Sequence, residues 1–381
     1  MSNPLSASTR IFGTNATYHH PDRLAKSSGK EAWQVKLGDF AAVGTLLASD
    51  KGLVFLQTPE QLIAVNTANG SVRWKQESQA IGNAILTPND GLLHVQGKDL
   101  VLRSAETGDI LKKLPVQANA NFVPRLTTNQ LILVQETVGD KTLLSAYDLA
   151  LNKAWDIPFS QTHAQLQVYP LKDSLILLSQ EGVSCYSLDG KKVWSLSVAQ
   201  IGGQLPNLIA KLSEDSLLLH NYSTKVPSLI LTISTAQVKP IQLPDAIVGF
   251  PVVVHKPDGE FALFYQAQAK DLGFGNKEYR LVMVDQQGNK RWEVTNSVQP
   301  RFMIADQSGN LFVAFSPTLE QFNLYGSYRE SSPCFVKGFD TKGSELFTYT
   351  ASNPRPILSP LSIGVEGELY FVADGTLHAI H

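Results

Sequence analysis

The sequence predicts an all-β fold, an eight-bladed β-propeller built from four-stranded antiparallel blades. Three observations lead to this prediction. One hairpin pattern recurs along the chain, its copies are about 37 to 55 residues apart, and each interval holds several short apolar runs separated by turns. Four short strands in a period of this length are typical of a propeller blade.

The clearest copy of the hairpin spans residues 61–74. Residues 62–65 (Leu-Ile-Ala-Val) form an apolar run of the composition expected for a buried strand. Residues 66–70 supply Asn and Gly for a tight turn, and Val72 and Trp74 then share one face of the next strand. Because a lone hairpin is marginal in water, this unit must pack against other copies of itself.

All five tryptophans lie about three or four residues after such a turn: Trp33, Trp74, Trp155, Trp194 and Trp292. Weaker copies occur near residues 111, 241 and 347, which makes eight positions. The first copy has no inner strands before it, whereas the last period (residues 360–380) lacks an outermost strand. We therefore expect residues 30–38 to complete the last blade beside the C-terminal strand, which closes the ring and removes its open edges.

This organisation divides the chain into an N-terminal extension (residues 1–28) and a single propeller domain (residues 29–381). The extension contains His19 and His20. Adjacent side chains point in opposite directions on a strand, so the sequence favours a solvated tail here over a metal site.

Composition and sequence features limit which classes of partner and which cellular compartment are expected. Hydrophobic residues make up 43% of the chain and charged residues 17%, and the net charge of −2 argues against nucleic acid as the main partner. No apolar run has the length of a membrane span. Cys185 and Cys334 are expected to be buried, reduced thiols, with a bridge as the alternative. The start of the sequence lacks the features of a secretory signal, which favours the cytoplasm; if a leader was removed, the alternative is the periplasm or the cell surface.

The hairpin Leu62-x-Ala64-Val65-Asn66, followed by Gly70-x3-Trp74, resembles the repeat of the PQQ-like (quinoprotein dehydrogenase-like) β-propellers. Residues 105–108, 187–190 and 284–288 match the same pattern in part. The resemblance covers residues 29–381 and implies eight blades. That family contains quinone-dependent dehydrogenases and also non-catalytic relatives, such as assembly lipoproteins of the BamB type and scaffold propellers.

The resemblance also bears on cofactors. Enzymes of this family stack the quinone between a Trp and a disulfide of adjacent cysteines, and they bind Ca²⁺ through acidic and amide side chains. This sequence has no adjacent cysteine pair, and its five tryptophans are assigned to packing between blades. The comparison with the family therefore implies the non-catalytic branch, with no catalytic residues, no cofactor and no metal.

Two insertions are the main candidates for a binding surface. Residues 266–279 and 316–333 lie between the second and third strands of blades 6 and 7, where the sequence predicts long loops. Loops on a rigid scaffold often carry binding residues, and aromatic residues and Arg are enriched at interface hot spots. The predicted partner-binding residues are Phe274, Tyr279, Phe322, Tyr325, Tyr328 and Arg329 in the loops, with Arg125 and Arg301 near the mouth of the channel.

The leading hypothesis is a non-enzymatic module that presents this loop-rich face to a protein or peptide. The first alternative is a quinone-dependent or other small-molecule enzyme that acts at the channel mouth. The second is carbohydrate binding by the aromatic residues of blades 6 and 7. A structural alternative is that these aromatic residues only pack the loops onto their own blades.

Overall fold

The structure is a computed structural model. It describes residues 18–19, 23–26, 28–38, 43–77, 84–89, 91–116, 124–139, 141–159, 166–221, 227–248, 251–255, 260–273, 276–316, 334–351, 357 and 359–381. Over these ranges, no helix combines the length and the apolar character that crossing a membrane requires.

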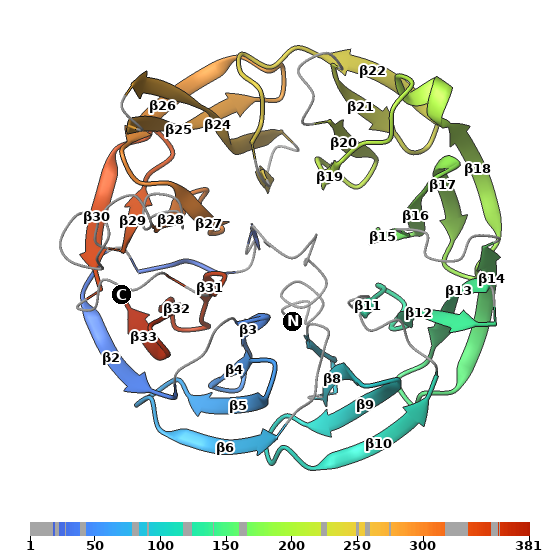
Figure 1. Cartoon of the computed structure of the whole chain (residues 1–381), viewed down its shortest axis with the longest axis horizontal. Coiled ribbons are helices and arrows are strands. Elements are labelled where there is room, and N and C mark those ends of the chain that lie inside the picture. The colour runs from blue at the N-terminus through green and yellow to red at the C-terminus, as the bar shows by residue number, and fades with distance from the viewer. Residues whose placement is uncertain are drawn as a thin grey trace.

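Eight sheets stand around a common axis, and each contains four antiparallel strands (Figure 1). The sheet of blade 7 has a fifth strand, β1, at its inner edge. Blade 1 consists of β3–β6, blades 2 to 7 follow in order up to β30, and blade 8 combines β31–β33 with β2. The predicted eight-bladed propeller is confirmed. Strands A to D run from the axis to the rim.

The strands have the following bounds. The A strands are β3 (Thr45–Ala48), β7 (Ile85–Leu86), β11 (Arg125–Leu126), β15 (Gln167–Pro170), β19 (Leu208–Lys211), β23 (Val252–His255), β27 (Pro300–Ala305) and β31 (Ser362–Ile363). The B strands are β4 (Leu53–Gln57), β8 (Gly91–Gln96), β12 (Ile132–Val138), β16 (Ser174–Ser179), β20 (Ser216–His220), β24 (Phe261–Gly273), β28 (Leu311–Phe315) and β32 (Leu369–Ala373). The C strands are β5 (Gln61–Asn66), β9 (Asp99–Ser104), β13 (Lys141–Tyr147), β17 (Gly182–Ser187), β21 (Ser228–Thr232), β25 (Asn276–Asp285), β29 (Phe335–Phe339) and β33 (Thr376–Ile380). The D strands are β6 (Val72–Glu77), β10 (Ile110–Pro115), β14 (Lys153–Phe159), β18 (Lys192–Ser197), β22 (Gln237–Ile241), β26 (Lys290–Asn296), β30 (Glu345–Thr350) and β2 (Glu31–Lys36). The remaining elements are β1 (Tyr18–His19) and the short 3₁₀ helix η1 (Val198–Ile201).

The ring closes through its two ends. Strand β2 pairs antiparallel with β33, so that Trp33 lies opposite Ala379, and the two strands lie side by side in Figure 1. The backbone N–H of His381 also donates to the carbonyl of Lys30 at 2.8 Å. The closure predicted from the missing strands at each end of the sequence is therefore confirmed.

Each tryptophan joins its blade to the next one. The indole N–H of every Trp donates to a backbone carbonyl in the C–D turn of the following blade: Trp33 to Thr67 (2.6 Å), Trp74 to Ala105 (2.9 Å), Trp155 to Leu188 (3.0 Å), Trp194 to Ile233 (2.9 Å) and Trp292 to Thr341 (3.2 Å). In the turn that receives Trp74, Gly108 has a φ of +78°, and a Cβ there would lie 2.8 Å from the indole ring. The Gly therefore serves both the turn and the close approach of the ring.

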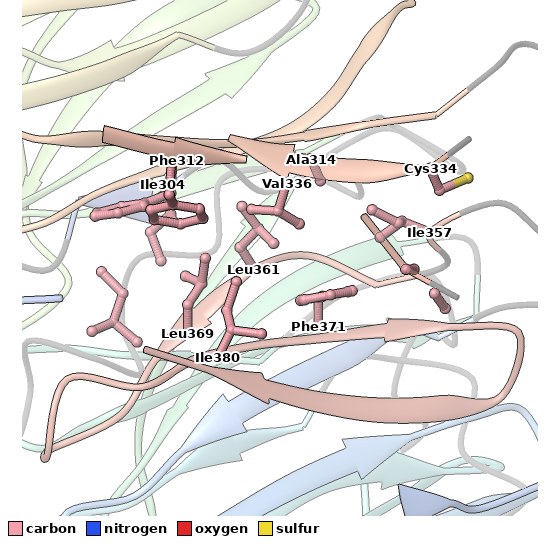
Figure 2. Close-up of a cluster of buried hydrophobic side chains, with 14 residues drawn as sticks. Ile304, Phe312, Ala314, Cys334, Val336, Ile357, Leu361, Leu369, Phe371 and Ile380 are labelled. Carbon is pink, nitrogen blue, oxygen red and sulfur yellow. The ribbon is translucent and has the colours of Figure 1, made fainter. Parts of the chain in front are cut away.

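The cores lie between blades. The buried apolar residues form eight clusters, and each cluster joins residues of two neighbouring blades. Figure 2 shows the cluster between blades 7 and 8, where Phe312 and Val336 face Leu369 and Phe371. Cys334 lies in this cluster and Cys185 in another, and both are buried thiols outside any disulfide, as predicted.

The N-terminal segment is attached to the ring, and the predicted solvated tail is wrong for the part that the structure describes. Strand β1 pairs parallel with the inner strand β27, with Tyr18 opposite Ile304. The N–H of Gln307 donates to the carbonyl of Arg23 at 2.8 Å, and the N–H of Lys26 donates to the carbonyl of Gly367 at 2.8 Å.

Candidate functional site

The meander gives the disc two different faces. The A–B and C–D turns, such as residues 49–52 and 67–70, emerge on one side, which we call the turn face. The B–C connections and the blade-to-blade connections emerge on the other side, which we call the loop face. All predicted partner-binding residues were assigned to the loop face.

The largest described feature of the loop face is a long hairpin in blade 6. Residues 266–279 were predicted as a loop, and this prediction is wrong because β24 continues to Gly273 and β25 begins at Asn276. Opposite charges face each other near its tip, where Lys270 is paired with Glu278 and Asp271 with Lys277. Such pairs stabilise a hairpin, and together with the alternation Gln-Ala-Gln-Ala at residues 266–269 they were the sequence signal for strands.

A half-buried charge cluster holds the base of this hairpin. Nη2 of Arg280 donates to Oδ1 of Asp245 at 2.9 Å and to the carbonyl of Gln268 at 3.1 Å, and Nη1 lies 3.7 Å from Oε1 of Glu293. Arg280 is on β25, Asp245 precedes blade 6 and Glu293 is on β26. The guanidinium therefore joins three segments of the chain and lies between two carboxylates. Sequence reasoning missed this cluster because its members are far apart along the chain.

The segment that enters blade 6 adds backbone pairing to the same hairpin. The N–H of Val248 donates to the carbonyl of Gln266 at 2.8 Å, and Ile247 forms an isolated bridge with Ala267. Above this base, Leu272 is 56% exposed, and Val248 is also exposed. The result is a rigid projection that carries apolar side chains into solvent.

The predicted site residues divide into three groups. The first group lies outside the described residues and consists of Phe274, Phe322, Tyr325, Tyr328 and Arg329. The second group is Tyr279 alone. Tyr279 is only 5% exposed, so its ring packs within blade 6 and is not part of the projecting surface.

Arg125 and Arg301 form the third group, and they do not come together. Each lies at the start of an inner strand, Arg125 on β11 of blade 3 and Arg301 on β27 of blade 7. These blades are on opposite sides of an eight-bladed ring (Figure 1). Arg301 is exposed at a shift of register between Pro300 and Phe302, and such bulges re-aim a side chain. It therefore shares the loop face with the neighbouring blade 6 hairpin.

A quinone or a metal ion would need a particular set of side chains to hold it. Within the described residues, no group of three or more His, Cys, Asp and Glu side chains is arranged to hold a metal ion. Each of the five tryptophans of the chain donates its indole N–H at a contact between two blades. Cys185 and Cys334 belong to blades 4 and 7. These residues do not fit the Trp and disulfide sandwich that the family resemblance would require.

Comparison with known proteins agrees with the geometry. Residues 22–204 match the family described as "Outer membrane protein assembly factor BamB". The match spans just under half of the chain and includes blades 1 to 4. No curated protein sequence matches this chain.

Solved structures with a similar fold include two alcohol dehydrogenases and BamB. The quinohemoprotein alcohol dehydrogenase ADHIIG from Pseudomonas putida HK5 is 11% identical and superposes with a TM-score of 0.64, over 99% of this chain and 80% of the other. BamB from Moraxella catarrhalis is 12% identical, with a TM-score of 0.54 over 92% of this chain and 97% of the other. The quinohemoprotein alcohol dehydrogenase from Comamonas testosteroni is 11% identical, with a TM-score of 0.61 over 94% and 78%. At these identities the likeness concerns the fold, and the fold alone does not decide between catalysis and binding.

Proposed function

We propose that this eight-bladed propeller is a non-enzymatic scaffold that binds a protein or peptide on its loop face, through blades 6 and 7. The observation that carries the proposal is the hairpin β24–β25. It projects beyond the blade, its base is held by Arg280, it exposes Leu272 near its tip, and the entry segment at its base exposes Val248. Rigid projections with exposed apolar side chains bind partners with little loss of conformational entropy.

The charges of the hairpin indicate how the partner would bind. Lys270 and Asp271 lie on one strand near the tip, and Lys277 and Glu278 lie on the other. Charged residues on strand edges oppose the addition of a further strand. The partner is therefore expected to contact the side chains of the hairpin, including Leu272, and not to extend its sheet.

The blade 7 insertion and Arg301 extend the proposed surface. The predicted residues Phe322, Tyr325, Tyr328 and Arg329 belong to that insertion, and Arg301 is exposed on the adjoining inner strand. Aromatic residues and Arg beside an apolar anchor have the composition of an interface hot spot.

Photo-crosslinking in cells of the native host tests this proposal. The photoreactive residue p-benzoylphenylalanine would replace Leu272 or Arg301, and in a matched control it would replace Val193, which is 62% exposed at the rim of blade 4. We expect the two loop-face positions to yield the same crosslinked protein and the control position to yield none of it. Crosslinks that are equally abundant from Val193, or none from either loop-face position, would refute the proposal.

A titration with pyrroloquinoline quinone in the presence of Ca²⁺ tests the enzymatic alternative. The scaffold proposal expects no saturable change in the absorption spectrum of the quinone. Stoichiometric binding together with oxidation of an alcohol would replace the scaffold function with a catalytic one.

A further inference from the structure

The outer edge of blade 7 differs from the outer edges of the other blades. Each D strand is the last strand of its sheet, so a row of its backbone N–H and C=O groups faces away from the sheet. Blade 7 ends in β30, and among the described residues the backbone of this strand pairs only with β29. The outer edge of β30 can therefore accept a further strand.

Seven of the eight D strands carry residues that oppose the addition of a strand. A charge on an edge strand has to be desolvated when another strand pairs with it, and Pro has no N–H to donate. The structure describes all eight D strands in full, and these residues are Lys36 on β2, Arg73 and Lys75 on β6, Lys112, Lys113 and Pro115 on β10, Lys153 and Pro158 on β14, Lys192 on β18, Lys239 and Pro240 on β22, and Lys290 and Arg291 on β26. Strand β30, with the sequence Glu-Leu-Phe-Thr-Tyr-Thr, contains no Lys, Arg or Pro. It is the one D strand without this protection.

The side chains of β30 favour pairing. Phe, Tyr and Thr are enriched in strands, and they occupy four of its six positions. Its single charged residue, Glu345, is compensated within the blade, because its carboxylate accepts from Nζ of Lys337 at 2.6 Å and from Oγ1 of Thr348 at 2.6 Å. Leu346 is 37% exposed at the rim. The edge therefore combines strand-forming residues with an exposed apolar side chain and a compensated charge.

The strand is complementary to a second copy of itself. Residues that lie opposite each other in an antiparallel pair point to the same face of the sheet, so a two-fold axis between two identical strands has to pass through a residue. An axis at Thr348 places the two Thr348 side chains opposite each other and Phe347 opposite Tyr349 of the other copy. Thr pairs and aromatic pairs stabilise neighbouring strands, and the two Glu345 side chains would lie at opposite ends. On β10 the same arrangement would bring two copies of Lys112 together, and like charges opposite each other are destabilising.

We propose that two copies of this chain associate through the outer edges of β30, which pair antiparallel around a two-fold axis at Thr348. Each copy has one such edge and a two-fold interface is closed, so the product is a dimer and not a fibre. A single pair of strands forms a small interface, and small interfaces are typical of weak association. We therefore expect the dimer to dissociate on dilution. Strand β30 lies at the rim of blade 7, whereas the hairpin β24–β25 belongs to blade 6, so the dimer and the scaffold proposal can fail separately (Figure 1).

Sedimentation velocity of the full chain over a series of concentrations tests the proposal. We expect monomer at low and dimer at high concentration. Leu346→Arg should weaken the dimer at least tenfold, because it places a cation where blades 1 and 6 have Arg73 and Arg291, three residues after the turn Gly. Val193→Arg, at the same position of β18, should leave the dimer unchanged.

Circular dichroism and the melting temperature establish that each variant is folded, and Thr348→Lys replaces Leu346→Arg if the latter is not. A monomer at every concentration would overturn the proposal and would leave the edge to a strand of another protein. A dimer that neither β30 variant weakens would also overturn it, because the copies would then associate elsewhere.

A disulfide tests the pairing itself. In the proposed register two Thr348→Cys side chains lie opposite each other, within reach of a disulfide, whereas two Thr350→Cys residues are about 14 Å apart. The native thiols Cys185 and Cys334 are buried. Mild oxidation should therefore give a covalent dimer from Thr348→Cys and none from Thr350→Cys. Equal crosslinking of the two variants, or no crosslinking of Thr348→Cys in a protein that sediments as a dimer, would overturn the proposal.

Discussion

One side-chain contact, repeated around the ring, connects blade to blade. The indole of each Trp fills the space above the next blade and donates to a carbonyl of its C–D turn. Two of these hydrogen bonds differ in their length and in how deeply they are buried. Trp74 is 8% exposed and its bond to Ala105 measures 2.9 Å, whereas Trp292 makes a longer and more exposed bond to Thr341, at 3.2 Å. A buried hydrogen bond costs more to lose than an exposed one, because water cannot replace the donor.

Trp74→Phe is therefore expected to lower the free energy of unfolding. In addition to the effect of the smaller ring, we expect a loss of about 1–2 kcal/mol, because the carbonyl of Ala105 is left without its donor. Trp292→Phe is the matched control and should cost less. Urea unfolding followed by circular dichroism measures both. An equal cost for the two variants would mean that the bond contributes nothing and that only ring volume matters.

A buried histidine makes the stability of blade 2 depend on pH. Nε2 of His94 accepts a hydrogen bond from Nε of Arg103 at 3.1 Å, and the side chain is fully buried. Burial, reinforced by the charge of Arg103, lowers the pKa of His94 from 6.5 to about 4. Burial also lowers the pKa values of His220 and His378.

The direction of the pH dependence follows from the linkage between proton binding and folding. The unfolded chain binds the proton more readily than the folded one, so the contribution of neutral His94 is complete above pH 6.5 and is lost as the pH falls toward 4. At one pKa unit per 1.36 kcal/mol, this loss amounts to about 3 kcal/mol. His94→Gln keeps an acceptor for Arg103 but does not titrate, and we expect its free energy of unfolding to fall less between pH 7 and pH 4.5. Parallel pH profiles for the two proteins would contradict this assignment.

Among the elements, the N-terminal segment acts as a second closure of the ring. Arg23 contacts blade 1 through Asp50 and blade 8 through Ile363, and its carbonyl accepts from Gln307 of blade 7. The N–H of Ala25 adds a bond to Oδ2 of Asp306 at 3.3 Å. Three blades are therefore tied together on the turn face by residues that precede the first strand of the ring.

Arg23→Ala should lower the free energy of unfolding by about 2–3 kcal/mol, because hydrogen bonds that involve a charged group are lost and two carbonyls lose their donor. Arg23→Lys keeps the charge but cannot bridge all three acceptors, so its effect should be intermediate. Arg73→Ala is the control, since the exposed pair with Glu106 is expected to contribute less than about 1 kcal/mol. Equal effects of Arg23→Ala and Arg73→Ala would contradict the stabilising role assigned to the N-terminal segment.

For the whole molecule, stability depends on the ring being complete. Every buried apolar cluster is shared by two blades, and the one between blades 8 and 1 includes Trp33 and Val35 of β2 together with Leu377 and Ala379 of β33. Without β2 the edge of β33 is open and this cluster is uncovered. An open edge beside an apolar surface promotes aggregation.

Deletion of residues 1–40 should accordingly abolish cooperative unfolding and cause aggregation. Deletion of residues 1–17 is the control, because it removes no contact among the residues that the structure describes. Size-exclusion chromatography and thermal denaturation distinguish the two cases. A soluble monomer of unchanged melting temperature after the longer deletion would show that β2 is dispensable.

The sequence alone determined the fold, the number of blades and the way the ring closes. These features are local and they are repeated along the chain. The apolar run at residues 62–65, the turn at Gly70 and the anchor at Trp74 recur at regular intervals, because every copy has to meet the same packing requirement. The candidate site was predicted only in part. Arg301 is exposed on the loop face as expected, but Tyr279 is buried because the predicted loop around it is a strand.

Only the tertiary structure revealed the charge cluster at Arg280 and the attachment of Arg23. Each of them joins residues from distant parts of the chain, such as Arg23 with Ile363 or Arg280 with Asp245. No local pattern marks these residues, because their neighbours in sequence are ordinary turn and edge residues. Arg280 acquires its partners when the strands of blade 6 pair with each other, and Arg23 acquires its partners because the closed ring brings blades 7, 8 and 1 side by side.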